Sequence, residues 1–296
     1  MAQLPRVVVV TRPTPYEELL ARHATRSQAD FFLRQRGQSI DAVEALHHQV
    51  RGAVASILAC IPLDWRRNHV SRAELDRFLF EPEDIIVVVG QDGLVANVSK
   101  YLTGQPVIGV NPLPEQFDGI LVNHRFEEGR RLLVPVAKGE VTPQPRTMVQ
   151  GTLDDGQTLC ALNELFIGHP SHQSARYEAD FHGTHVRHSS SGIIVSTGTG
   201  ATGWARSIVL ERNRAVQLPT PTESRLAFFV REAFPSAVTS IELTEGFIAP
   251  SESLGLTSRM EEGVVFGDGI ETDFLRFDWG RHLEVSIADQ RLMLVA

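Results

Sequence analysis

The segment 81–102, EPEDIIVVVGQDGLVANVSKYL, constrains the fold more than any other part of the chain. Residues 85–89 form an unbroken apolar run, which is typical of a strand buried on both faces of a parallel sheet. The chain then enters a GQDG turn and an expected helix, an arrangement whose N–H groups and helix dipole favour anions. Asp92 in that turn would repel phosphate unless it holds a metal or accepts a proton, so it predicts a chemical role. A plain β-turn is the alternative.

The first part of the chain alternates strand and helix patterns. Short apolar runs at 7–10 and 107–110 predict two more buried strands, and apolar residues at helical spacing from Ile40 onward predict an amphipathic helix capped by Ser39. Alternating strands and helices predict a parallel sheet with flanking helices. We therefore expect residues 1–112 to form an α/β nucleotide-binding domain that carries the GQDG turn.

The second part of the chain has a different sequence pattern. Prolines cluster after Asn111, and the apolar runs become short, with turn residues between them. We expect residues 113–296 to form a β-rich dinucleotide-binding domain, whose last ~20 residues could return to the first domain. His182-Gly183 and Asp268-Gly269 predict tight turns. The expected strands are 158–167, 176–181, 184–188, 192–197, 226–230, 240–243, 283–287 and 291–295.

Composition excludes several classes of protein. The net charge of −8 argues against a general nucleic-acid binder, and no apolar run is long enough to span a membrane. Two cysteines, Cys60 and Cys160, give no disulfide framework and favour a reducing compartment. A strand pattern begins almost at residue 1 and leaves no room for a targeting peptide. We expect a cytoplasmic protein with no membrane or nucleic-acid partner.

Two further clusters carry polar residues next to buried strands. Asn163 and Glu164 are adjacent within an apolar strand, so their side chains point to opposite faces. An amide and a carboxylate could bind the vicinal hydroxyls of a ribose; a strand end that reaches the surface is the alternative. Residues 192–204 form a strand that leads into a loop of glycines and threonines and then Trp204. Such a loop either approaches a ligand closely or is a flexible surface loop.

Together the three clusters resemble the NAD kinase family. The family's Gly-Gly-Asp-Gly-Thr motif corresponds to GQDGL at 90–94, its Asn-Glu pair to Asn163 and Glu164, and its threonine/glycine loop to 196–203. The likeness is closest to the mitochondrial-type branch, which shares VVVVTRPTPYE, PVIGVN and ALNELFIG. It extends from Val7 to about Ser207 and then fades.

The resemblance implies a fold, a reaction and a set of site residues. The family has an α/β domain and a β-rich domain, and transfers the γ-phosphoryl group of ATP to the adenosine ribose 2′-hydroxyl of NAD, with Mg²⁺ or a similar ion. It implies a homodimer with NAD and ATP as substrates. By position, Asp92 would be the catalytic base or orienting group. The implied ligand contacts are Gly90 and Gly93 with nucleotide phosphates, Asn163 and Glu164 with ribose hydroxyls, and Thr199, Ala201 and Thr202 with adenine.

Two departures from the family motif leave alternatives open. Gln91 replaces a glycine, which would cost about 1 kcal/mol if that position needed a positive φ. Leu94 replaces a threonine and removes a hydroxyl from the start of the helix. These changes keep two alternatives in view, a non-catalytic NAD(P) sensor and a kinase for a different hydroxyl acceptor. The choices between NAD and NADH and between ATP and polyphosphate are also open.

Overall fold

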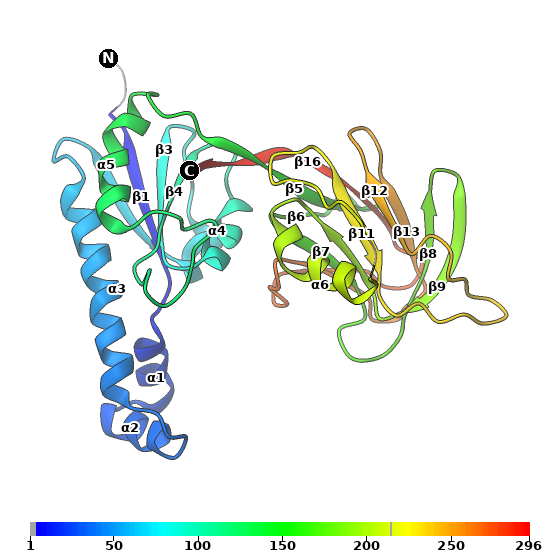
Figure 1. The fold of residues 1–296 in the computed structure, drawn as a ribbon, viewed down its shortest axis with the longest axis horizontal. Coiled ribbons are helices and arrows are strands. Elements are labelled where there is room, and N and C mark those ends of the chain that lie inside the picture. The colour runs from blue at the N-terminus through cyan, green and yellow to red at the C-terminus, as the bar shows by residue number, and fades with distance from the viewer. Residues whose placement is uncertain (1–3, 214) are drawn as a thin grey trace. The chain divides into compact units, whose positions relative to one another are not determined.

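The chain divides into two compact units in the computed structural model, which describes residues 4–213 and 215–296. The first unit comprises the chain up to Gln144 together with Met293–Ala296, and the second comprises Pro145–Leu292 (Figure 1). The sequence-based boundary at 112/113 falls inside the first unit. The reason is helix α5 (Phe126–Ala137), whose Leu133 and Val136 pack in the same core as the strands of that unit.

A parallel sheet forms the centre of the first unit. Val7–Val10 are fully buried in β1, as the apolar run predicts. The chain leaves β1, pairs β2 on one side, and then returns to place β3 on the other side. The winding direction therefore reverses between β1 and β3, which is where open α/β sheets bind ligands. The strand order is β2 (Arg66–Ser71), β1 (Arg6–Thr11), β3 (Asp84–Val89), β4 (Pro106–Val110) and the end of β16 (His282–Val295).

The helices of the first unit match the sequence patterns in part. Helix α3 begins at the predicted Ile40, and its Ala53, Val54 and Ile57 are buried against the sheet strands. Segment 11–38, whose helical pattern is weak, contains two helices with threonine N-caps. A capping box formed by Ser71 and Glu74 begins a 3₁₀ helix. The remaining bounds are α1 (Pro15–His23), α2 (Arg26–Arg34), α3 (Ile40–Cys60), η1 (Arg72–Arg77) and α4 (Asp92–Ser99).

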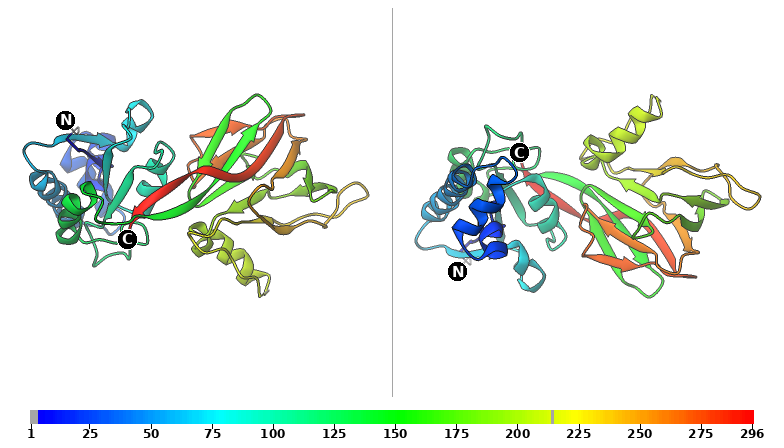
Figure 2. Two further views of the ribbon diagram at one scale, coloured as in Figure 1. Left: turned by 90° about the horizontal axis from the view of Figure 1, so that it is seen from above. Right: turned by 90° about the horizontal axis from the view of Figure 1, so that it is seen from below.

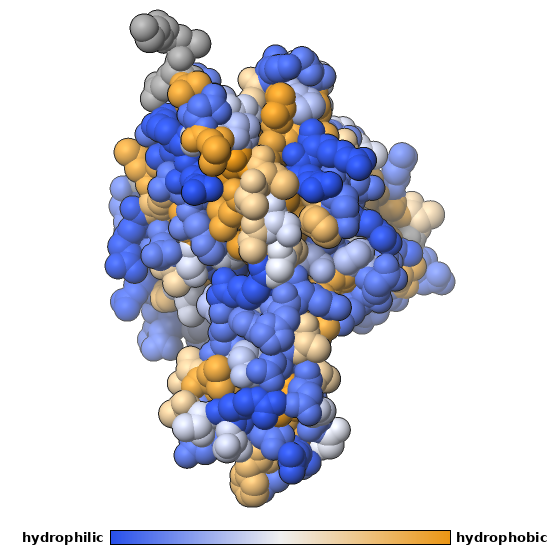
Figure 3. All heavy atoms as spheres, turned by 90° about the vertical axis from the view of Figure 1, so that its left-hand side faces the viewer, coloured by the Kyte–Doolittle hydropathy of each residue, from blue (hydrophilic) through white to orange (hydrophobic). Residues whose placement is uncertain are grey.

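Figure 3 shows the face seen from the left of Figure 1, where the helices α3 and α5 of the first unit lie. Hydrophilic residues cover much of this face, and smaller apolar areas lie between them. Isolated exposed apolar side chains are ordinary on a protein surface. No helix in the described ranges is long and apolar enough to cross a membrane.

Two layers of antiparallel strands form the second unit (Figure 2). One layer pairs β8 (Ala175–Phe181) with β9 (Thr184–Ser190) and β13 (Leu254–Ser258), and β13 with the start of β16. Strand β5 (Gln144–Leu153) pairs with β6 (Thr158–Ala161). Apolar side chains of both layers share one core, which contains Leu165, Val195, Tyr177 and Leu256. The other layer has the order β12 (Glu245–Ile248), β11 (Leu226–Val230), β10 (Ile193–Ser196), β7 (Glu164–Gly168), β14 (Val264–Gly267) and β15 (Phe274–Arg276).

Three strand predictions for the second unit are wrong. The expected strand 158–167 is broken at residues 162–163, because β6 pairs with β5 whereas β7 pairs with β10 and β14. The expected strand 240–243 is a loop, in which Leu243 has φ of 52° and Ser240 N–H donates to the Arg187 carbonyl. The two strands expected at the end of the chain are a single strand, β16.

Candidate functional site

The GQDG turn connects β3 to α4 without backbone strain. Gln91 has φ of −119° and ψ of 164°, an extended conformation open to any residue, and neither Gly90 nor Gly93 has a positive φ. The strain considered for Gln91 therefore does not arise. Gly90 N–H donates to the Val110 carbonyl, which ties the turn to the end of β4.

A cavity of about 150 Å³ lies beside this turn. Its lining includes Arg12 after β1, Gly90 and Gln91 after β3, and Leu113 after β4, with His47 from α3. The Arg12 guanidinium donates to the Gln91 side-chain carbonyl at 2.7 Å. The cavity is thus at the carboxyl ends of the strands, at the point where the winding direction reverses.

The Asp92 side chain anchors a distant loop. Oδ1 accepts hydrogen bonds from the N–H groups of Leu121 at 2.8 Å and Val122 at 3.0 Å, and Oδ2 accepts from Ile120 N–H at 3.0 Å. A carboxylate has about four acceptor positions, so Oδ2 keeps capacity for one more donor. The carboxylate that the sequence singles out for chemistry therefore also has a structural task.

Close backbone packing holds the same loop against the sheet. A Cβ on Gly109 would lie 1.9 Å from the Leu121 carbonyl oxygen, and one on Gly119 would lie 2.2 Å from the Val122 oxygen. Only glycine fits at either position. Leu94, which replaces the family's threonine, is buried and would lie 3.2 Å from a Cβ on Gly90. Its side chain supports the turn from within the core.

The Asn163–Glu164 pair and the threonine/glycine loop lie together in the second unit. Thr197 N–H donates to the Asn163 carbonyl at 2.9 Å, and Thr197 Oγ1 donates to the Leu162 carbonyl at 2.5 Å. A Cβ on Gly200 would lie 2.2 Å from the Asn163 carbonyl oxygen. Two motifs more than thirty residues apart are therefore in direct contact.

Asp268 organises the break between β6 and β7. Its carboxylate accepts hydrogen bonds from Asn163 N–H at 2.7 Å and Leu162 N–H at 3.1 Å, and its own N–H donates to the Glu164 carbonyl at 3.0 Å. The two amides donate to this carboxylate at the point where the strand predicted over 158–167 is interrupted. Sequence reasoning placed Asp268 only in a turn and missed this contact.

Glu164 is a half-buried carboxylate with an altered affinity for protons. Burial, and then the charge of Asp268, raise the pKa of Glu164 to about 7. Within the described ranges the Glu164 side chain accepts no hydrogen bond. Both oxygens of Asp268, in contrast, accept backbone N–H groups. A carboxylate of raised pKa without a donor is typical of a ligand-binding or catalytic position.

The threonine/glycine loop, residues 196–203, is held mainly by the protein itself. A Cβ on Gly198 would lie 1.9 Å from the Thr220 carbonyl oxygen, so this glycine serves internal packing. Thr202 is exposed, and its Oγ1 donates to the Thr199 carbonyl at 3.3 Å. Ala201 is half-buried in the short helix η2 (Gly200–Thr202). The ring of Trp204, at the start of α6 (Trp204–Glu211), stacks on Phe166 at 6.1 Å.

Thr199 differs from its neighbours in this loop. Only 4% of the residue is exposed, and its Oγ1 is buried without a hydrogen-bond partner in the described part of the chain. An unpaired buried hydroxyl costs about 1–3 kcal/mol, so such a group calls for an explanation such as a ligand. The structure thus unites Asn163, Glu164 and Thr199 in the second unit, whereas Gly90, Asp92 and Gly93 lie in the first.

Comparison with known sequences identifies relatives of one kind. The chain is 27% identical over 268 residues to mitochondrial NAD kinase 2 of Homo sapiens, covering 72% of this chain and 60% of that protein. The rat protein of the same name is 27% identical over 263 residues, which cover 72% of this chain and 62% of that protein. An NAD kinase of Ralstonia nicotianae is 28% identical over 132 residues, 42% of this chain and 43% of that one. The chain spans about three fifths of the length of the mitochondrial relatives, and no family model matches it.

Solved structures share the whole fold. Yeast NADH kinase in complex with NADH superposes with a TM-score of 0.64 at 14% identity, covering 100% of this chain and 84% of that one. An NAD kinase from Archaeoglobus fulgidus in complex with ATP superposes with a TM-score of 0.60 at 17% identity, covering 98% of this chain and 93% of that one. The predicted architecture, an α/β domain followed by a β-rich domain, is confirmed, and so is the resemblance to NAD kinases.

Proposed function

We propose that this chain, which resembles the NAD kinase family in sequence and in fold, is an NAD kinase. It would transfer the γ-phosphoryl group of ATP to the 2′-hydroxyl of the adenosine ribose in NAD and release NADP and ADP. The observation that carries the proposal is the contact of the Asn163–Glu164 pair with the loop 196–203, because this contact assembles two of the motifs shared with that family.

The acceptor side of the reaction is assigned to the second unit. The Glu164 carboxylate has no recorded donor among the described residues, and vicinal ribose hydroxyls would supply two. Asn163 adds an amide that can donate to a ribose oxygen or accept from a hydroxyl. Thr199, Ala201 and Thr202 would line the adenine, with Thr199 Oγ1 free to bond a ring nitrogen.

The donor side is assigned to the first unit. Gly90 lines the cavity at the carboxyl ends of the strands, and Gly93 has nothing within 4 Å of an added Cβ. Phosphates of ATP can therefore approach the turn and the N-terminus of α4, whose dipole favours negative charge. The Arg12 guanidinium, held by Gln91, brings positive charge to the same cavity. Gln91 thus need not exclude a nucleotide from this turn.

Asp92 is proposed as the catalytic carboxylate. The O2′–P bond forms while the bond from the γ-phosphorus to the bridging oxygen breaks, and the hydroxyl proton passes to the remaining acceptor position on Oδ2. The three backbone hydrogen bonds to Asp92 would fix its orientation before the substrate arrives. Such positioning is the main demand that phosphoryl transfer makes on a protein.

Mg²⁺ is proposed to accompany ATP. The described residues contain no group of three or more His, Cys, Asp or Glu side chains that could hold a metal, which fits an ion bound mainly through substrate phosphates and water. Bound in this way, the ion would neutralise phosphate charge. ATP is the proposed donor, and polyphosphate is the competing one.

The decisive experiment is incubation of the protein with ATP, Mg²⁺ and either NAD or NADH, followed by chromatographic detection of NADP or NADPH. Product with NAD supports the proposal, and the ratio of the two products gives the acceptor preference. Saturable NAD binding without product under several donors and metals would instead favour the NAD(P) sensor. Loss of product in Asp92→Asn, but not in the exposed Asp64→Asn, separates this activity from a contaminant.

A homodimer is proposed from the family resemblance, and a cytoplasmic location from the composition of the chain. Size-exclusion chromatography with light scattering measures the mass directly, and the value for one chain is 32.8 kDa. A mass that stays at this value at micromolar concentration would exclude the dimer.

A further inference from the structure

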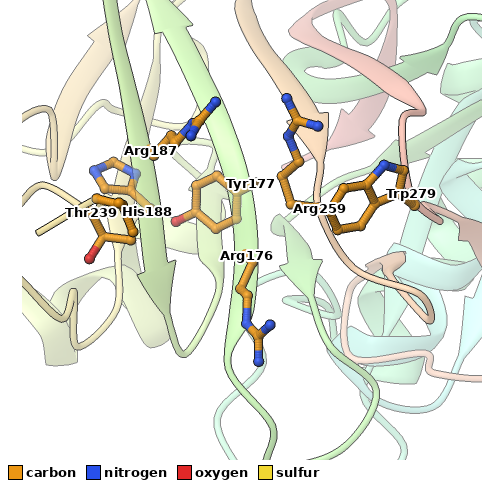
Figure 4. A pocket seen from close by; sticks show the side chains of 8 residues that line it. Arg176, Tyr177, Arg187, His188, Thr239, Arg259 and Trp279 are labelled. Carbon is orange, nitrogen blue, oxygen red and sulfur yellow. The ribbon is translucent and has the colours of Figure 1, made fainter. Parts of the chain in front are cut away.

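A second cavity, of about 430 Å³, lies in the second unit, on the layer that contains β8, β9 and β13. Figure 4 shows its side chains. Its walls come from β8, β9, the loop before β12 and the segments that follow β13 and precede β16. No residue assigned above to NAD or ATP lines it. Its size is that of a typical small-molecule pocket.

Two buried aromatic residues pair across β8 and β9 where these strands line the cavity. Tyr177 and His188 are each 1% exposed, and their rings meet edge to face at 5.4 Å. His188 Nε2 lies 2.8 Å from the Glu242 carbonyl oxygen, which only accepts, so Nε2 carries the proton. Burial lowers the pKa of His188 and keeps the ring neutral. Nδ1 is therefore an acceptor that is buried with no partner among the described residues, and it lies on the core face of β9, opposite to Arg187.

Two arginines supply the charge of the cavity. Arg187 Nε and Arg259 Nη2 both donate to Oε1 of Glu178, at 2.8 Å and 2.9 Å. One carboxylate between two guanidiniums leaves a net positive charge, and the remaining N–H groups of both can bind an anion. Glu178 competes for both arginines, but it occupies only one N–H group of each in the hydrogen bonds above. The Arg176 guanidinium points away from both in Figure 4.

An exposed indole completes the cavity. Trp279 is 61% exposed, and its ring lies beside Arg259, whose guanidinium carbon is 5.4 Å from the ring centroid (Figure 4). An indole at the rim of a basic cavity provides a face on which a planar ring can stack. The positive charge next to it favours a ligand that carries an anion close to that ring.

We propose that this cavity binds a nucleoside monophosphate, as a second nucleotide site distinct from the NAD and ATP sites. The base would stack on Trp279, and the phosphate would bind Arg187 and Arg259. These two features complement two different parts of one ligand class. A simple anion would use only the arginines.

AMP is the probe, in the Asn163→Ala background, which removes a proposed ribose contact and so weakens competing AMP binding at the proposed NAD site. Calorimetry gives the affinity, and quenching of Trp279 fluorescence, absent in Trp279→Phe, locates the ligand. Two control ligands are tested in parallel: ribose 5-phosphate, which lacks the base, and adenosine, which lacks the phosphate. We expect AMP to bind at least tenfold more tightly than either.

Arginine variants make the test specific. Arg259→Gln and Arg187→Gln should each weaken AMP at least tenfold, whereas Arg206→Gln, an exposed arginine on α6, should change nothing. If Arg259→Gln fails to fold, Arg259→Lys replaces it, since lysine keeps the charge but loses the forked donor geometry. AMP binding that is unchanged in these variants, or equal to binding of ribose 5-phosphate, would overturn the site. So would a concentration-dependent dimer that dissociates in Trp279→Ala, because a second copy would then cover the cavity.

Discussion

The Asp268 carboxylate accepts the Asn163 N–H at 2.7 Å and thereby places a second negative charge beside Glu164. The hydrogen bond to Asn163 helps to form the break between β6 and β7. The negative charge of Asp268, added to burial, raises the pKa of Glu164 to about 7. The geometry of the turn and the protonation of the proposed ribose ligand are therefore linked through one residue.

Glu164→Gln should change how stability depends on pH. The folded-state pKa of about 7 lies above the ordinary value of 4.5, so the folded protein binds more protons between these values and loses stability as pH rises through this range. Glutamine removes the effect. As the pH rises from 4.5 to 8, the free energy of unfolding of the parent should fall by about 1–3 kcal/mol relative to that of the variant. Contact of part of the side chain with water keeps this difference small. Urea unfolding at both pH values measures this, with the exposed Glu271→Gln as control.

Asp92→Asn should lower both turnover and stability. An amide group would turn N–H donors toward at least one of the three backbone N–H groups that Asp92 accepts, so the free energy of unfolding should fall by about 1–3 kcal/mol. NADP formation should fall by about 10²–10⁴ through loss of the base. Unfolding curves and initial rates separate the two effects. An unchanged rate would refute the catalytic role, and an unchanged stability would refute the role as an anchor.

Gly93→Ala tests whether the backbone of the turn approaches phosphate. An added Cβ meets nothing within 4 Å, so the protein alone does not require glycine there, and alanine in a helix should stabilise by about 0.4–1 kcal/mol. If ATP phosphates lie against this turn, KM for ATP should rise severalfold. Gly52→Ala, another helical glycine with open space, is the matched control and should leave KM unaltered.

Gly200→Ala should damage the acceptor site through the fold. Its Cβ would lie 2.2 Å from the Asn163 carbonyl oxygen, and one of the two backbones must move. We expect a loss of about 1–3 kcal/mol in stability and weaker NAD binding. In Gly255→Ala the nearest atom is at 3.5 Å, an ordinary contact, and both properties should stay near those of the parent. Thermal shift with and without NAD measures them together.

The parts of the fold that were predicted correctly rest on local patterns. The run 85–89 and the turn after it occupy adjacent residues, so β3 and α4 could be recognised from one short segment. Helix α5 has Pro135 inside it and follows a cluster of prolines, and the same composition suggested a domain boundary. Strand β2 carries charged and polar residues on an edge of the sheet, so it shows no apolar run.

The contacts that organise the candidate site could not be predicted because their partners are far apart in the chain. Asp92 bonds residues 28–30 positions away, and Asp268 bonds residues 105 and 106 positions away. The expectation that Asn163 and Glu164 occupy one unbroken strand failed for the same reason. Residue type and motif order identified these positions, but their neighbours depend on tertiary structure.

Strand β16 has a consequence for synthesis of the protein in the cell. Its residues Met293–Val295 pair with β4, and the other three parallel strands beside β4, namely β2, β1 and β3, all come from residues before 90. During translation β4, with its buried Val107 and Ile108, must wait with one edge open while nearly two hundred residues emerge from the ribosome. The nascent chain therefore carries an unpaired strand edge, which is open to association with other chains, until residues 293–295 have been synthesised.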